Sequence, residues 1–117
     1  MTPTTVTGAG VSTDPAHYVA TAHAELHAAD FNATGRDERH ALADLYLDLA
    51  MVLADAPPAL EYVAAVAERL ESAQSCAARQ RWFDAQLWTD SAKRHLRVAR
   101  VSGHAAKRAA RAHTAQS

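Results

Sequence analysis

Apolar residues recur at helical spacing along most of this 117-residue chain. A first helix is predicted over residues 15–30, because an acceptor side chain at Thr13 or Asp14 precedes Pro15, which suits the first helical position. Residues 1–12 are polar, lack periodicity and are predicted to form a disordered leader. The expected core face of the first helix consists of Val19, Ala22, Leu26 and Ala29.

The segment 36–56 is the most apolar part of the chain. It follows Phe31–Gly35, where Gly35 can adopt a positive φ, and it ends at Pro57, since the residue before a proline leaves the α region. Its apolar stripe is Leu42, Leu45, Leu49, Val52 and Leu53. The narrow polar stripe that remains is acidic and consists of Asp37, Asp44, Asp48 and Asp55. A helix that is apolar on most sides is surrounded by neighbours, so we expect this helix at the centre of a bundle.

Residues 59–102 contain neither glycine nor proline. A single helix of that length would extend roughly 66 Å, which is unusual for a compact domain. We therefore predict an interruption between Ser72 and Trp82, which separates a third helix beginning at Pro58 from a fourth. The apolar rows of these helices are Leu60, Val63, Val66, Leu70 and Ala77, and then Phe83, Leu87, Trp88, Ala92 and Leu96.

Gly103 is predicted to cap the fourth helix at its C-terminal end. The expected organisation is then a leader at 1–12, a helical bundle domain at 13–103 and a frayed basic tail at 104–117.

Composition supports an all-α class with three to four helices. Alanine occupies 29 positions and isoleucine none, and β-branched and aromatic residues are too sparse for a sheet. Cys76 is the only cysteine, so no intramolecular disulfide can form and a cytoplasmic location is expected. The leader lacks the pattern of a signal peptide, and no segment approaches the roughly 20 apolar residues of a membrane span. We therefore expect no membrane partner.

The charges are divided between the two parts of the chain. Residues 1–72 carry three arginines against eleven acidic side chains, a balance of −8, whereas residues 73–117 carry nine basic against two acidic side chains, a balance of +7. This division predicts either a basic segment for an anionic partner or an acidic surface against which the basic half packs.

The basic half contains a regular row, in which residues 93, 97, 100, 104, 107 and 111 recur at intervals of 4, 3, 4, 3 and 4. On a helix this row forms one face that can follow phosphates, and an aromatic ring can stack on an exposed base. We therefore predict non-specific nucleic-acid binding. The candidate binding residues are Lys93, Arg97, Arg100, Lys107, Arg108 and Arg111, with Arg79 and Trp82 at the margin.

Other interpretations of the basic row remain open. The row can be a solvated face, can pair with the acidic stripe of the second helix, or can bind a protein or an anionic membrane. A protein–protein module or a homo-oligomer that pairs acidic with basic helices is the main alternative function.

No catalytic or cofactor motif stands out, so the expected function is that of a non-enzymatic adaptor without a cofactor. The strongest metal candidate is His23 with His27, four residues apart on the first helix, with Asp30 or His40 as a further ligand. Their order, His-Ala-Glu-Leu-His, differs from the His-Glu-x-x-His of metalloproteases. We expect no metal site there, and a metal-binding or enzymatic bundle remains the third alternative.

Overall fold

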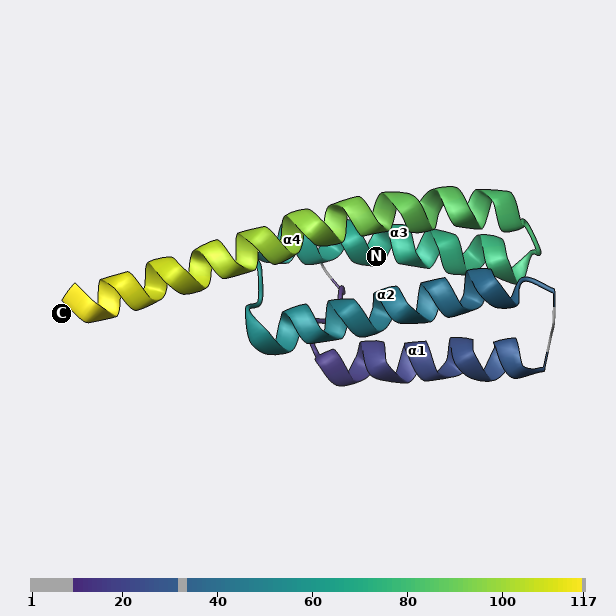
Figure 1. The fold of residues 1–117 in the computed structure, drawn as a ribbon, viewed down its shortest axis with the longest axis horizontal. Coiled ribbons are helices and arrows are strands. Elements are labelled where there is room, and N and C mark those ends of the chain that lie inside the picture. Colours follow the sequence, from purple (N-terminus) through teal and green to yellow (C-terminus); the bar gives the residue numbers. More distant parts are fainter. Residues whose placement is uncertain (1–9, 32–33, 117) are drawn as a thin grey trace, which may run out of the picture.

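The computed structural model describes residues 10–31 and 34–116, and this part of the chain forms four helices without a strand (Figure 1). The helices are α1 (Pro15–Asp30), α2 (Arg36–Asp55), α3 (Leu60–Ala78) and α4 (Trp82–Gln116). The predicted all-α bundle is therefore confirmed. The first nine residues of the predicted leader and residues 32–33 of the first break lie outside the described residues.

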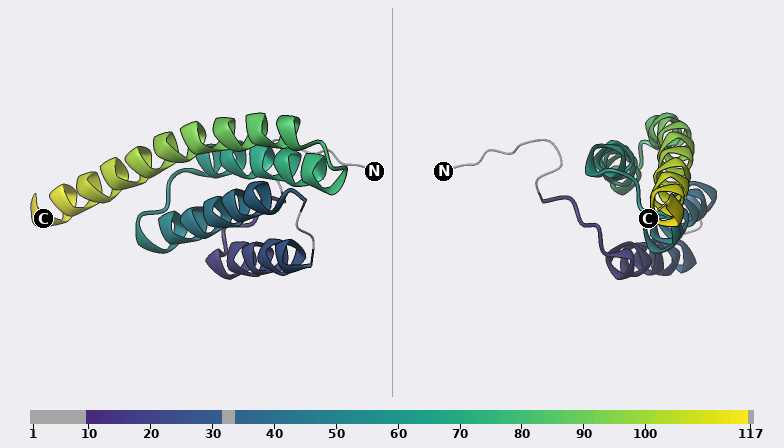
Figure 2. Two further views of the ribbon diagram at one scale, coloured as in Figure 1. Left: turned by 45° about the vertical axis from the view of Figure 1, so that its right-hand side comes forward. Right: turned by 90° about the vertical axis from the view of Figure 1, so that its left-hand side faces the viewer.

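The bundle consists of two antiparallel helical hairpins, α1–α2 and α3–α4, which pack together through α2. α1 packs against α2, α3 packs against α4, and α2 also contacts both helices of the second hairpin, as the views in Figure 2 show. The central position predicted for the most apolar helix is thus confirmed. Leu42, Leu49 and Leu70 are among the largest side chains that are fully buried in the shared core.

The helix ends have local causes in the sequence. The Asp14 carboxylate accepts a hydrogen bond from the Ala16 amide at 3.0 Å and caps α1. α2 begins after Gly35, whose φ of 74° lies in the left-handed region. α3 begins at Leu60, with Ala59 at its N-cap, rather than at Pro58 as predicted, because Ala59 has extended backbone angles.

The predicted interruption between Ser72 and Trp82 is confirmed by the turn between α3 and α4. Gln80 takes a positive φ of 60°, while the amide of Arg81 donates to the carbonyl of Cys76 at 2.9 Å and the amide of Gln80 donates to that of Ala77 at 3.0 Å. These are the two bonds of a Schellman motif, which here ends a helix without glycine.

Two predicted core faces are wrong in detail. In α1 the buried face is Tyr18, Ala22, Glu25 and Ala29, whereas Val19 and Leu26 are exposed. The face is rotated because the aromatic ring of Tyr18 and the paired carboxylate of Glu25 face α2 and α3. In α4 the predicted apolar row is also only partly buried. Ala92 and Leu96 are buried, whereas Phe83, Leu87 and Trp88 are exposed.

Gly103 is not the predicted C-terminal cap. It lies inside α4, which continues to Gln116, and it is buried against the loop after α2. A Cβ atom built on Gly103 would lie 1.9 Å from the carbonyl oxygen of Ala56. Glycine is therefore required here for the close approach of two backbones, and not for a positive φ.

We expect Gly103→Ala to destabilise the protein by about 1–2 kcal/mol, because the added methyl group forces two backbone segments apart. At an exposed helical site the same change stabilises by up to about 1 kcal/mol, so the sign of the effect is diagnostic. Urea unfolding monitored by circular dichroism measures it, and a stabilised variant would show that α4 does not pack on Ala56.

Candidate nucleic-acid interface

The basic row lies on one uninterrupted helix. Because α4 continues through Gly103, residues 93 to 111 form a single face that extends roughly 27 Å at 1.5 Å per residue. Of the predicted binding residues on α4, all the arginines and Lys93 are exposed, and Lys107 is half-buried. The row lies beside the buried residues Ala92, Leu96 and Ala99, about a quarter turn around the helix from them, and those residues hold the first half of the helix on the bundle.

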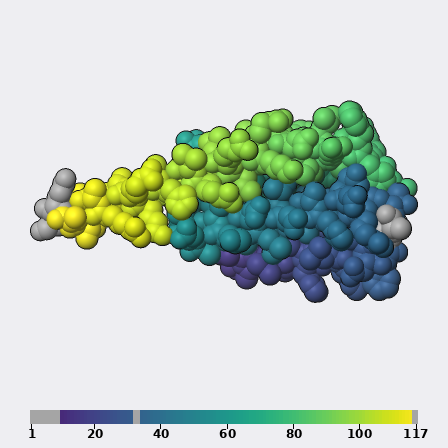
Figure 3. Space-filling view, in the orientation of Figure 1, coloured from purple at the N-terminus to yellow at the C-terminus, as the bar shows by residue number. Residues whose placement is uncertain are grey.

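The second half of the row extends beyond the bundle. In Figure 3 the C-terminal part of α4 projects from the body as a narrow extension. Ala106 and Ala110 continue the inner face of the helix, but both are exposed because the other three helices do not reach them. Arg108 and Arg111 are therefore reachable from several directions.

One contact joins the acidic stripe of α2 to this row. The ammonium group of Lys107 lies 3.0 Å from the carboxylate of Asp55, and it also donates to the Asp55 carbonyl at 3.3 Å. The Lys107 hydrogen bond and charge, with smaller effects of His104 and Arg111, lower the pKa of the Asp55 carboxyl below its usual value. Within the described residues this is the one ion pair between the acidic stripe and α4, although Lys93 lines a hollow with Asp37 and Glu38, and Arg100 lines one with Asp55.

The two marginal candidates lie at the opposite end of α4. Arg79 is exposed at the turn that ends α3. Trp82 is half-buried beneath Gly35, where a Cβ would lie 2.2 Å from the indole ring, and the Arg39 guanidinium lies 5.8 Å from the ring centroid. The indole therefore closes the end of the bundle, about three turns before Lys93, the first residue of the row.

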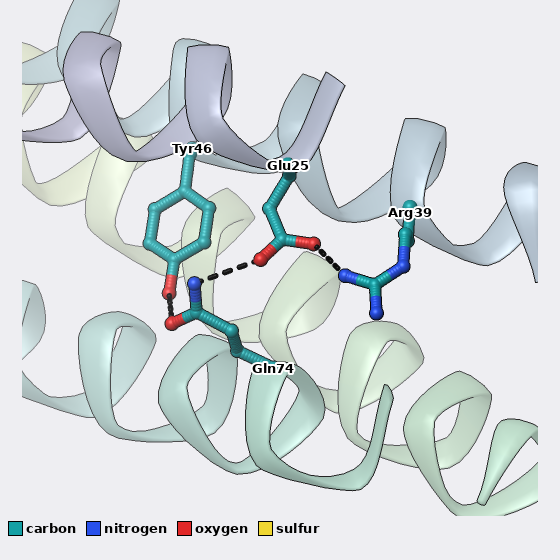
Figure 4. Close-up of polar contacts among 4 residues, drawn as sticks. All are labelled: Glu25, Arg39, Tyr46 and Gln74. Atoms are coloured by element: carbon teal, nitrogen blue, oxygen red, sulfur yellow. Dashed lines mark hydrogen bonds and ion pairs between the residues drawn. The ribbon is translucent and has the colours of Figure 1, made fainter. Parts of the chain in front are cut away.

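A buried polar cluster joins the two hairpins and was not predicted from the sequence. It consists of Glu25 of α1, Arg39 and Tyr46 of α2, and Gln74 of α3 (Figure 4). Arg39 donates to one oxygen of Glu25 at 2.9 Å, and the Gln74 amide donates to the other at 2.8 Å. The Tyr46 hydroxyl donates to the Gln74 carbonyl oxygen at 3.3 Å. The side chain of Glu25 is only 7% exposed, so its burial is compensated by the hydrogen bonds from these partners.

Next to this cluster a groove of about 660 Å³ lies between α1 and α3, beneath Gly10–Ser12. The rings of Tyr18 and Tyr46 stack at its floor, with their centroids 6.1 Å apart. Burial, and then the charge of Glu71, raise the pKa values of both tyrosines. Both hydroxyls therefore remain protonated at neutral pH and act as donors, Tyr18 to the Ser12 carbonyl at 2.6 Å.

The histidine pair of α1 has a different environment from a metal site. His23 and His27 are exposed, and the His27 ring packs edge-on against Phe31 with centroids 4.9 Å apart. Among the described residues, no three His, Cys, Asp or Glu side chains are grouped closely enough to hold a metal ion. In the same part of the chain, no helix has both the length and the apolar character needed to cross a membrane.

Comparison of the chain with protein-family models, with curated proteins and with solved structures gives no match. A function can therefore be inferred only from the residues of this chain.

Proposed function

We propose that this protein binds nucleic acid through its phosphate backbone, along the basic row of α4, without reading the base sequence. The observation that carries the proposal is the continuity of α4 through Gly103, which unites Lys93, Arg97, Arg100, Arg108 and Arg111 on one exposed and projecting helix. A duplex presents about one negative charge per 1.7 Å of its axis, so a row of cations on a rigid helix meets several phosphates at once.

The charge division supports the same proposal. The acidic residues before Ala73 repel a polyanion from the rest of the bundle, so contact is favoured along α4 and its projecting end. Phosphate contacts carry no sequence information, and side chains suited to reading base edges are scarce in the row apart from arginine. Binding is therefore weak, about micromolar or poorer at physiological salt.

Fluorescence anisotropy of labelled mixed-sequence duplex DNA and of RNA, titrated with the full chain over a salt series, tests the proposal. We expect a linear fall of log K with log salt, and a slope that decreases by about two when Arg97 and Arg100 are both replaced by alanine. Both side chains are exposed, so the melting temperature of this variant should match that of the wild type.

The matched control removes two positive charges that lie outside the row, by Arg36→Ala together with Arg81→Ala, both at exposed sites. We expect this control to change the slope less. Equal loss in the two variants would mean that binding follows net charge rather than the row, and no binding of the wild type at low salt would exclude nucleic acid as the ligand.

A further inference from the structure

The outer side of α4 carries a second row, which is apolar and is left uncovered by the other helices. In Figure 2, α4 lies at the edge of the bundle, so that part of its surface is not covered by the other helices. Phe83 is 72% exposed, Leu87 53%, Val98 52% and Val101 63%. These residues, with Asp90 and Arg94 between them, recur at intervals of 4, 3, 4, 4 and 3, so the six side chains form one face of the helix.

The order of side chains in this outer row is self-complementary. The row begins with two apolar residues, continues with one acidic and one basic residue, and ends with two apolar residues. The apolar and charged positions therefore have the same order in both directions along the helix. When a second α4 is laid alongside in the opposite direction, Phe83 meets Val101 and Leu87 meets Val98. Asp90 then meets Arg94 of the second copy, and this pairing occurs twice. In a parallel arrangement Asp90 would meet Asp90 and Arg94 would meet Arg94, and both contacts are repulsive.

We propose that two copies of this chain associate as a two-fold antiparallel dimer through the outer row of α4. Two observations carry the proposal. Large apolar side chains are exposed on both sides of a charged pair along one helix face, and the order of the two charges is complementary only to a second copy that runs in the opposite direction. A symmetric dimer needs one self-complementary patch, which this row supplies.

The geometry of the dimer bears on the proposed nucleic-acid binding, although the dimer does not depend on it. The basic row lies along one side of the outer row, so a two-fold axis perpendicular to the helix pair keeps both copies of the basic row on the same side. Two copies of Lys93, Arg97 and Arg100 would then form one composite basic surface. The contact is a single pair of helices, so the dimer is expected to be weak, with a dissociation constant in the micromolar range.

Sedimentation equilibrium of the full chain over a range of concentrations tests the dimer directly. We expect the mass to rise from 12.5 kDa toward twice that value with concentration. Leu87→Ser and Val98→Ser should each weaken association by about tenfold or more, since each change occurs twice in the dimer. Met51→Ser, at a 66% exposed site on α2, is the matched control and should leave the mass distribution unchanged.

Charge reversal tests the antiparallel register. Asp90→Arg alone and Arg94→Asp alone should each abolish dimerisation, because both central contacts become repulsive. The doubly reversed variant should dimerise as the wild type does, and the two single variants mixed in equal amounts should form a heterodimer. Circular dichroism spectra and melting temperatures of the variants show whether each remains folded.

A wild type that stays monomeric at all concentrations would overturn the proposal, and the outer row would then be a site for a different protein or a lipid surface. A dimer that does not respond to the Leu87 or Asp90 variants would overturn it as well. Since mass is measured without nucleic acid, either failure is distinguishable from a failure of the basic row to bind DNA or RNA.

Discussion

Replacement of Glu25 by alanine should destabilise the protein by about 3 kcal/mol, since it leaves the Arg39 guanidinium buried without its carboxylate. The Arg39 side chain is only 15% exposed, and its Nε has no hydrogen-bond partner among the described residues. The variant also removes the acceptor of the Gln74 amide. This value is at the lower end of the range for a broken buried pair, because Arg39 retains some contact with water. Guanidinium chloride unfolding at neutral pH measures the loss.

A double variant separates two contributions to the free energy of unfolding: the penalty for leaving one charge unpaired, and the net stabilisation from the intact ion pair. Glu25→Leu combined with Arg39→Met replaces the two charges by apolar side chains of similar size, and methionine keeps the stem that packs near Trp82. We expect the double variant to lose much less stability than the sum of its single variants, because no unpaired charge remains. If the loss of stability in the double variant equalled the sum of the losses in the two single variants, the two side chains would not be energetically coupled. That result would contradict the 2.9 Å contact between them.

The ends of α1 could be predicted from the sequence, but its buried face could not. Asp14 and Pro15 are strong signals for a helix start, and the predicted range matches the observed helix. The face was wrong because alanine is so frequent in α1 that two rotations of the helix present similar apolar rows. Only the partners Arg39 and Gln74, distant in sequence, make the rotation that buries Glu25 favourable.

The turn before α4 and the role of Gly103 show the same limit of local signals. Gln80 takes a positive φ without being glycine or asparagine, so no residue type identified the end of α3. Gly103 is a residue typical of a helix end, but it serves a close contact with Ala56, which lies 47 positions earlier. Glycine has both uses, and the contact that distinguishes them is tertiary.

The candidate interface was more predictable than the core, because it depends on periodicity within one helix. The spacing of the basic row could be found without knowing the fold, whereas the environment of Trp82 depends on Gly35 of the other hairpin. Phe83 and Leu87 of the outer row were predicted to be core for the same reason: spacing identifies a face of a helix but not the side on which its neighbours lie.

Leu49→Ala should destabilise the protein by about 2–4 kcal/mol through lost burial and the cavity left behind. Leu49 is fully buried on α2, the helix that contacts all three others, so no single neighbour can move in to fill the space. Met51→Ala on the same helix is the matched control: it removes a side chain that is 66% exposed and should cost under about 0.5 kcal/mol. Thermal and urea unfolding of the two variants give the comparison. A loss under about 0.5 kcal/mol for Leu49→Ala would mean that the core is loose enough to collapse around alanine. The central position of α2 would then no longer account for the stability of the bundle.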